Sequence, residues 1–382
     1  MQVIFDDNGK HRTLAPLTLT RPVAELRIGI LTIRESWELL LKSSRENTSF
    51  ITENYLQEKF RAPNGQGLRI AGNIKPSRDL AQMVLSLEEN QSLYVNGIWI
   101  ATKGTEQHKI EQEVATPPFI AISALWQLFQ NNGLAISYDF DLLTQNKTTQ
   151  QLSATNTVLG KHEVFLEEGA QIECAILNAS NGPIYIGKNS EVMEGSIIKG
   201  PFALCENAVI KMGAKMYGDS TIGPFCKVGG EVSNSIFQAY SNKGHDGFVG
   251  NSLIGEWCNF GADTNTSNLK NNYSNVRLYS YETLRMENTD VTFCGVVMGD
   301  HSKTGINTML NTATSVGVCA NIFGGGFPPK KINSFSWGGF DGSDKFILEK
   351  AYEVGQNMMK RRNVSLTEAD KKILAHLYAQ LA

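Results

Sequence analysis

Three histidines stand apart from one another in polar, turn-forming stretches of this chain: His162, His245 and His301. His245 lies in S-N-K-G-H-D-G-F-V-G, residues 241–250, a glycine-spaced stretch that interrupts a regular apolar pattern. Histidine exchanges protons nearest neutral pH, so a positioned imidazole can take the proton that an amine releases when it attacks a carbonyl carbon. The residues alone leave two interpretations open: a proton-transfer group, or a surface-loop histidine without a role.

The element that must position His245 is a six-residue repeat. Stepping by six along the sequence meets only aliphatic residues or methionine at eight consecutive positions: Ile186, Val192, Ile198, Leu204, Ile210, Met216, Ile222 and Val228. With 41% hydrophobic residues such a run arises by chance on the order of once in a thousand tries in a given register. A period of six fits neither a helix nor a half-buried strand, and it predicts a triangular solenoid in which these residues point inward.

The repeat breaks after residue 230 and resumes twice. The first resumption meets Phe248, Ile254, Phe260 and Thr266, and the second meets Met298, Thr304, Leu310, Val316 and Ile322. We therefore expect two insertions in the prism, around 232–247 and around 267–291. The first of these would lift His245 out of the solenoid, and loops of this kind commonly carry function in repeat proteins.

The chain divides into three regions of different periodicity. Residues 1–152 mix strand-like runs (2–5 and 93–101) with helix-like runs (31–41 and 121–129), which predicts an α/β domain. Residues 153–342 form the solenoid. Residues 343–382 have helical periodicity, with a capping box expected over Ser365–Glu368, and predict a helical hairpin packed on the solenoid or on a neighbouring subunit.

The bulk composition excludes several classes of protein. The chain has 35 basic and 38 acidic residues, which gives no electrostatic argument for a nucleic-acid partner. Its one dense basic run, Lys360-Arg361-Arg362, is more typical of a solvated helix face. The first residues lack a basic segment followed by an apolar one, and no run of 18 apolar residues occurs, so we expect a cytoplasmic protein without a membrane partner.

The solenoid half resembles a known family. The hexads, the stretch around His245 and its continuation N-S-L-I-G-E-W-C-N-F-G-A-D-T-N-T-S-N-L are similar to the acetyltransferase half of the bifunctional N-acetylglucosamine-1-phosphate uridyltransferase/glucosamine-1-phosphate acetyltransferase family. The resemblance covers roughly residues 184–325. It implies a left-handed parallel β-helix, a homotrimer, acetyl-CoA as acyl donor and a small-molecule amino-sugar acceptor.

Residue roles carry over unevenly from that family. The resemblance makes His245 the catalytic general base, Asn259 a sugar-binding residue, and Ala262 and Asn268 neighbours of the acetyl-CoA thioester. Phe248 and Leu269 replace tyrosines, and Ser233 replaces a lysine, which leaves the acceptor open. Lys243 or Lys270 could substitute for that lysine in binding a sugar phosphate, or either could be a solvated surface lysine. In the stretch 299–308, Ser302 is either a cofactor contact or part of a structural turn.

The N-terminal region resembles the sugar-1-phosphate nucleotidyltransferases, which have a Rossmann-like fold. The matching segment is R-T-L-A-P-L-T-L-T-R-P, from Arg12 to Pro22, and the resemblance makes Arg21 a substrate-binding candidate. The departures are substantial: Gly9 alone stands where a glycine-rich phosphate loop is needed, Val23 stands in place of a lysine, and Asn96 in place of the metal-binding aspartate. We expect a domain of doubtful nucleotidyltransferase activity that needs Mg²⁺ only if it is active.

The sequence thus predicts an acetyl-CoA-dependent N-acetyltransferase acting on an amino sugar, an amino-sugar phosphate or a nucleotide-linked amino sugar. Two alternatives remain open: a bifunctional sugar-1-phosphate nucleotidyltransferase/acetyltransferase that makes UDP-N-acetylglucosamine for cell envelope biosynthesis, and a non-catalytic regulatory protein that binds a sugar nucleotide. A zinc enzyme on the same solenoid would need three convergent ligands, and the three isolated histidines show no ligand-type spacing, so no metal site is predicted.

Overall fold

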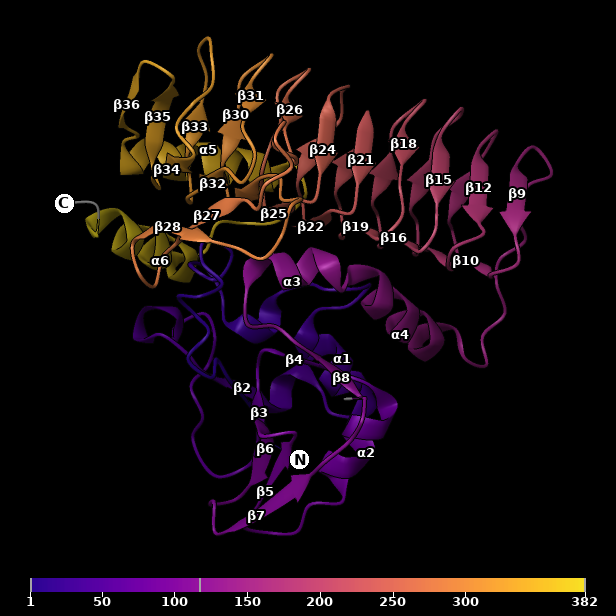
Figure 1. Ribbon diagram of the computed structural model, residues 1–382, viewed down its shortest axis with the longest axis vertical. Helices are drawn as coiled ribbons and strands as arrows, with labels where there is room; N and C mark the ends of the chain where they lie inside the picture. The colour runs from indigo at the N-terminus through magenta and orange to yellow at the C-terminus, as the bar shows by residue number, and fades with distance from the viewer. Residues whose placement is uncertain (1, 117, 381–382) are drawn as a thin grey trace.

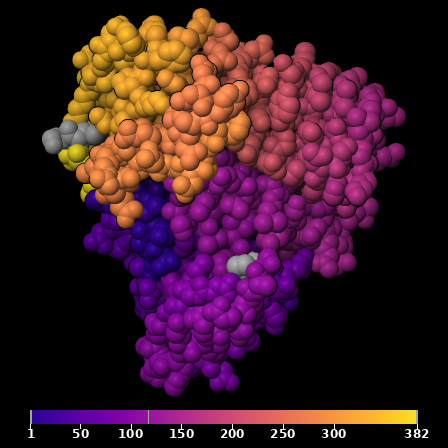
Figure 2. Space-filling model, viewed as in Figure 1, coloured from indigo at the N-terminus to yellow at the C-terminus, as the bar shows by residue number. Residues whose placement is uncertain are grey.

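The computed structural model describes residues 2–116 and 118–380 and has three parts (Figure 1). An α/β domain lies below a long parallel β-helix, and two C-terminal helices pack where the two meet. The fold class predicted from the sequence is confirmed, and the parallel sheets of the solenoid are consistent with a left-handed β-helix. Figure 2 shows the N-terminal domain, in indigo and purple, projecting from one long side of the solenoid.

The N-terminal domain is built on a mixed sheet with strand order β2-β1-β3-β6-β5-β7 in its described part. The strands are β1 Val3–Asp6, β2 Thr48–Ile51, β3 Leu68–Ala71, β5 Gln91–Val95, β6 Ile98–Lys103 and β7 His108–Gln112. A small antiparallel pair, β4 Ile74–Pro76 and β8 Phe119–Ala121, lies beside it. The helices are α1 Ile33–Leu40, α2 Arg78–Leu85, α3 Leu125–Gln130 and α4 Asn132–Thr144, with 3-10 turns η1 Val23–Glu25, η2 Arg45–Asn47 and η3 Asn54–Leu56. Thr32 and Glu35 form a reciprocal capping box that fixes the start of α1.

One strand expected from the sequence is in fact a hairpin. The run 93–101 is split between β5 and β6, which pair antiparallel across a turn at Asn96 and Gly97. Asn96 has a φ of 50° and is exposed. It therefore sits at a hairpin tip, where the left-handed conformation favours Asn-Gly, and it is not the counterpart of a metal ligand at the end of a central strand.

The solenoid has three faces, which the chain visits in turn. The first face is the sheet β10 Val164–Leu166, β13 Ile184–Ile186, β16 Phe202–Leu204, β19 Ser220–Ile222, β22 Ile236–Ala239, β25 Leu253–Glu256, β29 Val297–Met298, β32 Ser315–Val316 and β34 Lys331–Ile332. The second face is β11 Gln171–Ile172, β14 Glu191–Val192, β17 Val209–Ile210, β20 Lys227–Val228 and β23 Asn242–Lys243, continued past Asn259 by β30 Lys303–Thr304, β33 Asn321–Ile322, β35 Ser336–Gly339 and β36 Gly342–Lys345. The third face is β9 Thr157–Gly160, β12 Ile176–Ala179, β15 Ile197–Lys199, β18 Lys215–Met216, β21 Glu231–Ser233 and β24 Phe248–Gly250, followed by the pair β26 Asn265–Thr266 and β31 Met309–Leu310.

The hexad residues line the inside of this prism, as predicted. All eight, from Ile186 to Val228, lie in strands and are at most 2% exposed. The resumed positions Ile254, Phe260, Met298 and Leu310 are equally buried. Because neighbouring coils stack these side chains in one continuous apolar core, each coil is stabilised by the coils on either side.

One of the two expected insertions is present and the other is not. Residues 232–247 contain β22 and β23 and belong to the prism; the coil spacing there shortens from 18 residues, as between Leu204 and Ile222, to 15, as between Thr221 and Ile236. This shift makes Val249, and not Phe248, the inward residue of β24. The second insertion is real and forms the hairpin β27 Arg277–Ser280 and β28 Arg285–Asn288.

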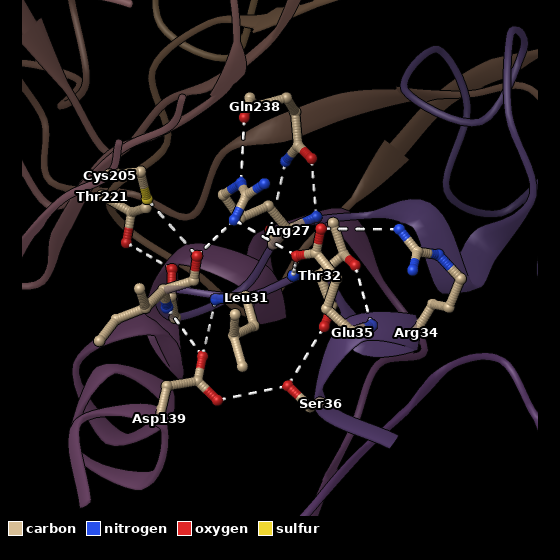
Figure 3. A network of polar contacts seen from close by, with 12 residues as sticks. Arg27, Leu31, Thr32, Arg34, Glu35, Ser36, Asp139, Cys205, Thr221 and Gln238 are labelled. Carbon is tan, nitrogen blue, oxygen red and sulfur yellow. Dashed lines mark hydrogen bonds and ion pairs between the residues drawn. The ribbon is translucent and has the colours of Figure 1, made fainter. Parts of the chain in front are cut away.

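The N-terminal domain is fixed to the first face of the solenoid by polar contacts around Arg27 (Figure 3). The backbone N–H of Arg27 donates to Gln238 Oε1 at 2.7 Å, and its Nε donates to the Gln238 carbonyl at 3.0 Å. Thr221 Oγ1 donates to the carbonyl of Gly29 at 2.9 Å. Behind this segment the buried pair Lys75 and Asp139, 2.7 Å apart, ties the loop to α4. The two domains therefore share a specific, desolvated interface.

The C-terminal helices α5 Leu348–Lys360 and α6 Glu368–Ala379 pack on their own chain. His376 of α6 stacks on Tyr55 of the N-terminal domain with ring centroids 4.2 Å apart, and Tyr378 meets Phe335 of the solenoid at 5.0 Å. The capping box is formed by Thr367 and Asp370, two residues later than predicted. Within the described residues, every helix is too short or too polar to cross a membrane.

Candidate functional site

His245 lies at the corner between the second and third faces, in the turn from β23 to β24. The turn is part of a regular coil, since the Gly229 N–H donates to the Lys243 carbonyl at 2.7 Å and the Asp263 N–H to the Asp246 carbonyl at 3.2 Å. Its imidazole is exposed and has no hydrogen-bond partner among the described residues. The solenoid thus presents His245 from a rigid corner rather than from an inserted loop, with both ring nitrogens free for a ligand.

Two of the predicted site residues are neighbours of His245. Asn242 and Asn259 pair in adjacent coils, and the same 17-residue offset joins Asp246 to Asp263. This register places Ala262 one coil from His245, at the spacing of roughly 4.8 Å between paired strands. The Asn242 side chain donates to Asn259 Oδ1 at 2.9 Å, which leaves the Asn259 amide group free to donate. His245 and Ala262 therefore share one corner, and Asn259 lies three residues before that corner on the second face of the same coil as Ala262.

Two carboxylates complete this corner and were not predicted from the sequence. Asp246 and Asp263 follow His245 and Ala262 directly, lie one coil apart, and are both exposed. Stacked carboxylates attract a cation such as a protonated amine. One feature of the sequence could have indicated these carboxylates: Asp263 stands where the family pattern A-G-T-I-T-x-N has a glycine.

Lys243 has a structural role at the same corner. It occupies the inward position of β23, in register with Val228, and is 1% exposed. Its Nζ donates to the carbonyls of Gly229 at 3.1 Å and His245 at 2.8 Å. Burial lowers the pKa of Lys243 to about 8, against the opposing pull of Asp246 and Asp263. Lys243 therefore fixes the His245 turn from inside the prism and is not available to a sugar phosphate.

Asn268 and Lys270 lie away from His245, at the corner between the third and first faces. Asn268 Nδ2 donates to Asn251 Oδ1 at 2.7 Å, and the Lys270 ammonium is bonded to Ser274 and to the Asn275 carbonyl within the second insertion. A groove of about 540 Å³ runs along this corner, and its lining includes Lys199, Tyr217, Asp219, Asn251 and Phe293. The width of the third face, roughly three residues or 10 Å, separates this groove from His245.

Ser302 and His301 are enclosed by protein. The Ser302 hydroxyl donates to the Gly317 carbonyl at 2.6 Å and accepts from the Ala320 N–H at 3.0 Å, so it stabilises two coils instead of facing a cofactor. His301 is half-buried between the solenoid and α5 with its Nδ1 enclosed, and this desolvation lowers the pKa of its imidazole to about 3. It is uncharged at neutral pH and lies outside the His245 corner.

Arg21 ties the two domains together through ion pairs, and only its Nε is left without a partner among the described residues. It is 5% exposed, and its guanidinium pairs with Glu256 at 2.7 Å and with Asp300. Both carboxylates belong to the solenoid, and they hold the pKa of Arg21 above its ordinary range despite the opposing effect of burial. The segment that resembles a substrate-binding motif thus serves as a domain contact.

The loop after β1 is filled by its own carboxylates. Asp7 accepts from the Val23 N–H at 2.7 Å and from the Thr52 hydroxyl at 2.5 Å, and Asp6 accepts from the Asn8 N–H at 2.7 Å. These backbone donors are the groups that would cradle a phosphate, and two carboxylates already occupy them. The loop therefore lacks the electrostatics for nucleotidyl transfer.

The histidines of the chain do not converge. His162 lies in the turn after β9, far along the solenoid from the corner that carries His245 (Figure 1). Among the described residues, no group of three His, Cys, Asp or Glu side chains is placed to hold a metal ion.

Comparison with known proteins agrees with this architecture. Residues 2–148 match the sequence profile of the family described as sugar nucleotidyl transferase. The chain is 28% identical over 154 residues to the bifunctional protein GlmU of Trichodesmium erythraeum, covering 40% of this chain and 28% of that protein. It is 34% identical over 118 residues to the GlmU of Methanocaldococcus jannaschii, covering 31% and 26%. The matched segments thus span about a quarter of the length of these relatives.

Among solved structures, the polysialic-acid-specific acetyltransferase NeuO is similar over 60% of this chain and all of that chain, at 13% identity and a TM-score of 0.24. A similarity at that level carries no inference about the present chain.

Proposed function

We propose that this chain, a divergent relative of the bifunctional GlmU proteins, is a transferase that acetylates the amine of an amino sugar, with acetyl-CoA as donor and His245 as general base. The observation that carries the proposal is the corner where an exposed, unpartnered imidazole lies beside Ala262 and two carboxylates, with Asn259 on the adjoining second face.

The corner supplies what the reaction needs. An amino sugar is mostly protonated at neutral pH, and Asp246 and Asp263 attract its ammonium group toward His245. After that group loses one proton, the amine nitrogen attacks the thioester carbonyl carbon, so a C–N bond forms and the C–S bond breaks. His245 takes the second proton from nitrogen and returns it to the departing sulfur, which leaves as a thiol. General base catalysis of this type contributes about 10² to 10⁴ in rate.

The second face supports a phosphate on the acceptor. Lys227 lies on this face two coils before Asn259, Lys211 lies one coil earlier, and Arg361 and Arg362 of the C-terminal segment approach them. Burial, followed by the charges of Arg362, Lys211 and Arg361, lowers the pKa of Lys227, while Glu191 opposes this shift. These cations make no ion pair within 4.0 Å among the described residues, so they remain free to bind an anion. An amino-sugar phosphate or a nucleotide-linked amino sugar fits this charge distribution better than a neutral sugar.

The third face offers a surface for a second copy of this chain. Its exposed strand residues include Leu159, Ile176 and Ile197, which are 38–46% exposed and lie on consecutive coils. In a homotrimer these residues would be covered, and His245 at the edge of the same face would border the neighbouring prism. His245 lines none of the five clefts described for the single chain, which accords with a site that a second subunit completes.

The test is thiol release from acetyl-CoA with glucosamine, glucosamine phosphates and nucleotide-linked amino sugars as acceptors. Wild type should release thiol with at least one acceptor, and His245→Ala should lower kcat/KM by about 10² to 10⁴. His162→Ala is the matched control, because His162 is an exposed histidine in a turn of the same solenoid. Absence of thiol release with every acceptor, or equal losses in both variants, would contradict the proposal.

A further inference from the structure

A cleft of about 320 Å³ lies between the N-terminal domain and the corner that joins the first and second faces of the solenoid. Its lining combines three kinds of group: cations, carboxylates and the rings of neighbouring coils. The residues that matter here are Arg21, Glu25, Arg34, Arg45, Lys59, Glu206, Phe225, Tyr240 and Glu256. Clefts at domain interfaces with a few polar groups around an apolar wall are common ligand sites.

A ladder of stacked rings begins in the solenoid wall of this cleft, which Phe225 and Tyr240 line. Phe225 stacks on Tyr240 with centroids 5.0 Å apart, Tyr240 on Trp257 at 4.1 Å, and Trp257 on His301 at 6.4 Å, with interplanar angles of 14° or less. All four hold the same corner position in successive coils, with φ between 55° and 59°. This left-handed conformation is costly for bulky side chains, by roughly 1 kcal/mol or more each.

The ladder ends at the cleft. One coil before Phe225 the same corner position is held by Asn207, with a φ of 55°, and one coil earlier by Asn189, with a φ of 52°. Asparagine is the residue expected in this conformation, so the switch to rings from Phe225 onward is not explained by the turn itself. Phe225 is half-exposed and lines the cleft, and no protein ring stacks on its Asn207 side within the described residues. A flat ligand ring can therefore stack on the exposed part of the Phe225 ring.

The polar group beside the exposed part of the Phe225 ring suits a ligand ring that carries N–H donors. Glu206, the residue before Asn207, is exposed, lines the cleft and forms no ion pair among the described residues. A carboxylate accepts from the ring and exocyclic N–H groups of nucleobases. A sugar ring lacks the flat aromatic face that would continue the stack.

The other wall of the cleft supplies cations with spare donors. Arg45 pairs with Glu25 at 3.0 Å but is 46% exposed, and Lys59 pairs with Asp370 at 2.9 Å and is 42% exposed. A guanidinium has five N–H donors, so one carboxylate leaves most of those of Arg45 free. The buried Nε of Arg21, which also lines the cleft, has no hydrogen-bond partner among the described residues.

From this arrangement we propose that the cleft binds a nucleoside diphosphate, whose base stacks on Phe225 and donates to Glu206 while its phosphates meet Arg45 and Lys59. The site is distinct from both the loop after β1 and the His245 corner. Because it touches both domains, its occupation stabilises their interface and gives the N-terminal half a role in binding without nucleotidyl transfer.

Isothermal titration of the full chain with UDP, CDP, ADP and GDP tests this site. At least one should bind, and Phe225→Asn should weaken that binding by about five- to a hundredfold, the range for loss of one stacked base. This variant copies the asparagine of the preceding coil, so it suits the backbone and should leave the melting temperature unchanged or higher. Tyr217→Ala, an exposed tyrosine on another corner of the solenoid, should bind as wild type does.

Arg45→Gln separates the phosphate from the base. It should weaken the diphosphate severalfold and leave binding of the corresponding nucleoside unchanged, and ribose 5-phosphate should bind more weakly than the diphosphate. No binding of any of the four nucleotides at millimolar concentration would overturn the proposal, as would binding that survives both Phe225→Asn and Arg45→Gln. Acetyl transfer is read separately: His245→Ala should keep nucleotide binding intact, so failure of one proposal is distinguishable from failure of the other.

Discussion

Two polar loops of this molecule look like sites, and they differ in where their polar groups point. In the loop after β1, Asp6 and Asp7 are 7% and 6% exposed and accept hydrogen bonds from the chain around them. At the His245 corner the imidazole and the carboxylates of Asp246 and Asp263 face solvent. A buried polar group must be paired within the protein, whereas an exposed one remains free for a ligand. The first loop therefore stabilises the fold, whereas the second presents groups that are free for chemistry.

The segment 12–22 extends the same contrast. Its family resemblance predicts substrate contacts, yet the guanidinium of Arg21 pairs with Glu256 and Asp300. An arginine that suits a phosphate also suits a pair of carboxylates, since both present oxygen atoms to its planar fork. Surface complementarity between the domains thus takes the place of ligand binding at this position.

The largest expected effect is on the domain interface. Arg21→Ala leaves the 5% exposed side chain of Asp300 beside the empty position without its cation, and breaking a buried pair in this way costs about 3–5 kcal/mol. Urea denaturation should show this loss of unfolding free energy. Arg285→Ala is the control, because Arg285 is 73% exposed where it meets Glu287 and such pairs contribute about 1 kcal/mol or less. Equal stability of the two variants would mean that Arg21 does not hold the interface.

A second substitution tests whether the His245 corner depends on rigid stacking. A Cβ added at Gly261, the residue before Ala262, would lie 2.3 Å from the Gly305 carbonyl oxygen of the next coil. Gly261→Ala must push two coils apart, and overpacking of this kind typically costs about 1–3 kcal/mol. We expect lower stability and reduced acetyl transfer together, by urea denaturation and thiol release.

Gly65→Ala provides the matched glycine control, since a Cβ there meets nothing within 4 Å. If Gly261→Ala lowered stability but left acetyl transfer unchanged, the corner would not need its close coil packing for function.

These positions also show what the sequence could predict. The inward residues of the hexads followed from local periodicity, because a coil repeats its own geometry. The six-residue count did not predict that Lys243 points inward. The coil spacing drops from 18 residues to 15 just before it, so the inward position that follows Val228 falls on Lys243. Arg21 and Asp300 are 279 positions apart, and no local pattern reports a contact that arises only when two domains dock. His245 was found by resemblance, while Asp246 and Asp263 became partners only through the 17-residue register.

The half-buried His301, whose Nδ1 is enclosed without a partner among the described residues, contrasts with His245 and should make stability depend on pH. Burial, with smaller contributions from Lys303 and Lys59, lowers the pKa of His301 to about 3, while Glu256 and Asp370 oppose the shift. In the unfolded chain the imidazole of His301 titrates near pH 6.5. Between about pH 6.5 and pH 3 the unfolded chain therefore binds a proton at His301 and the folded chain does not. The contribution of neutral His301 to the free energy of unfolding is therefore complete above about pH 6.5. It falls as the pH drops toward 3, by up to about 1.4 kcal/mol per pH unit.

The measurement is the difference in unfolding free energy between wild type and His301→Gln at pH values from 7.5 to 5. The difference isolates His301 because the carboxylates titrate alike in both proteins. The unfolding free energy of wild type minus that of His301→Gln should decrease at each lower pH. A difference that stays constant across this range would show that His301 binds a proton equally well in the folded protein and in the unfolded chain.

The smallest expected effect concerns the acceptor amine. Asp263→Asn removes one of the two carboxylates beside His245 and keeps the size of the side chain. Because an exposed ion pair is worth about 0.2–1 kcal/mol, KM for an amino-sugar acceptor should rise about 1.4- to fivefold with little change in kcat. The increase should shrink at high salt, which screens exposed charges. Asp344→Asn makes the same change of net charge at an exposed position on β36 and should leave KM unaltered. A fall in kcat at constant KM would instead place Asp263 in the proton-transfer step, and the corner would then use two acid–base groups instead of one.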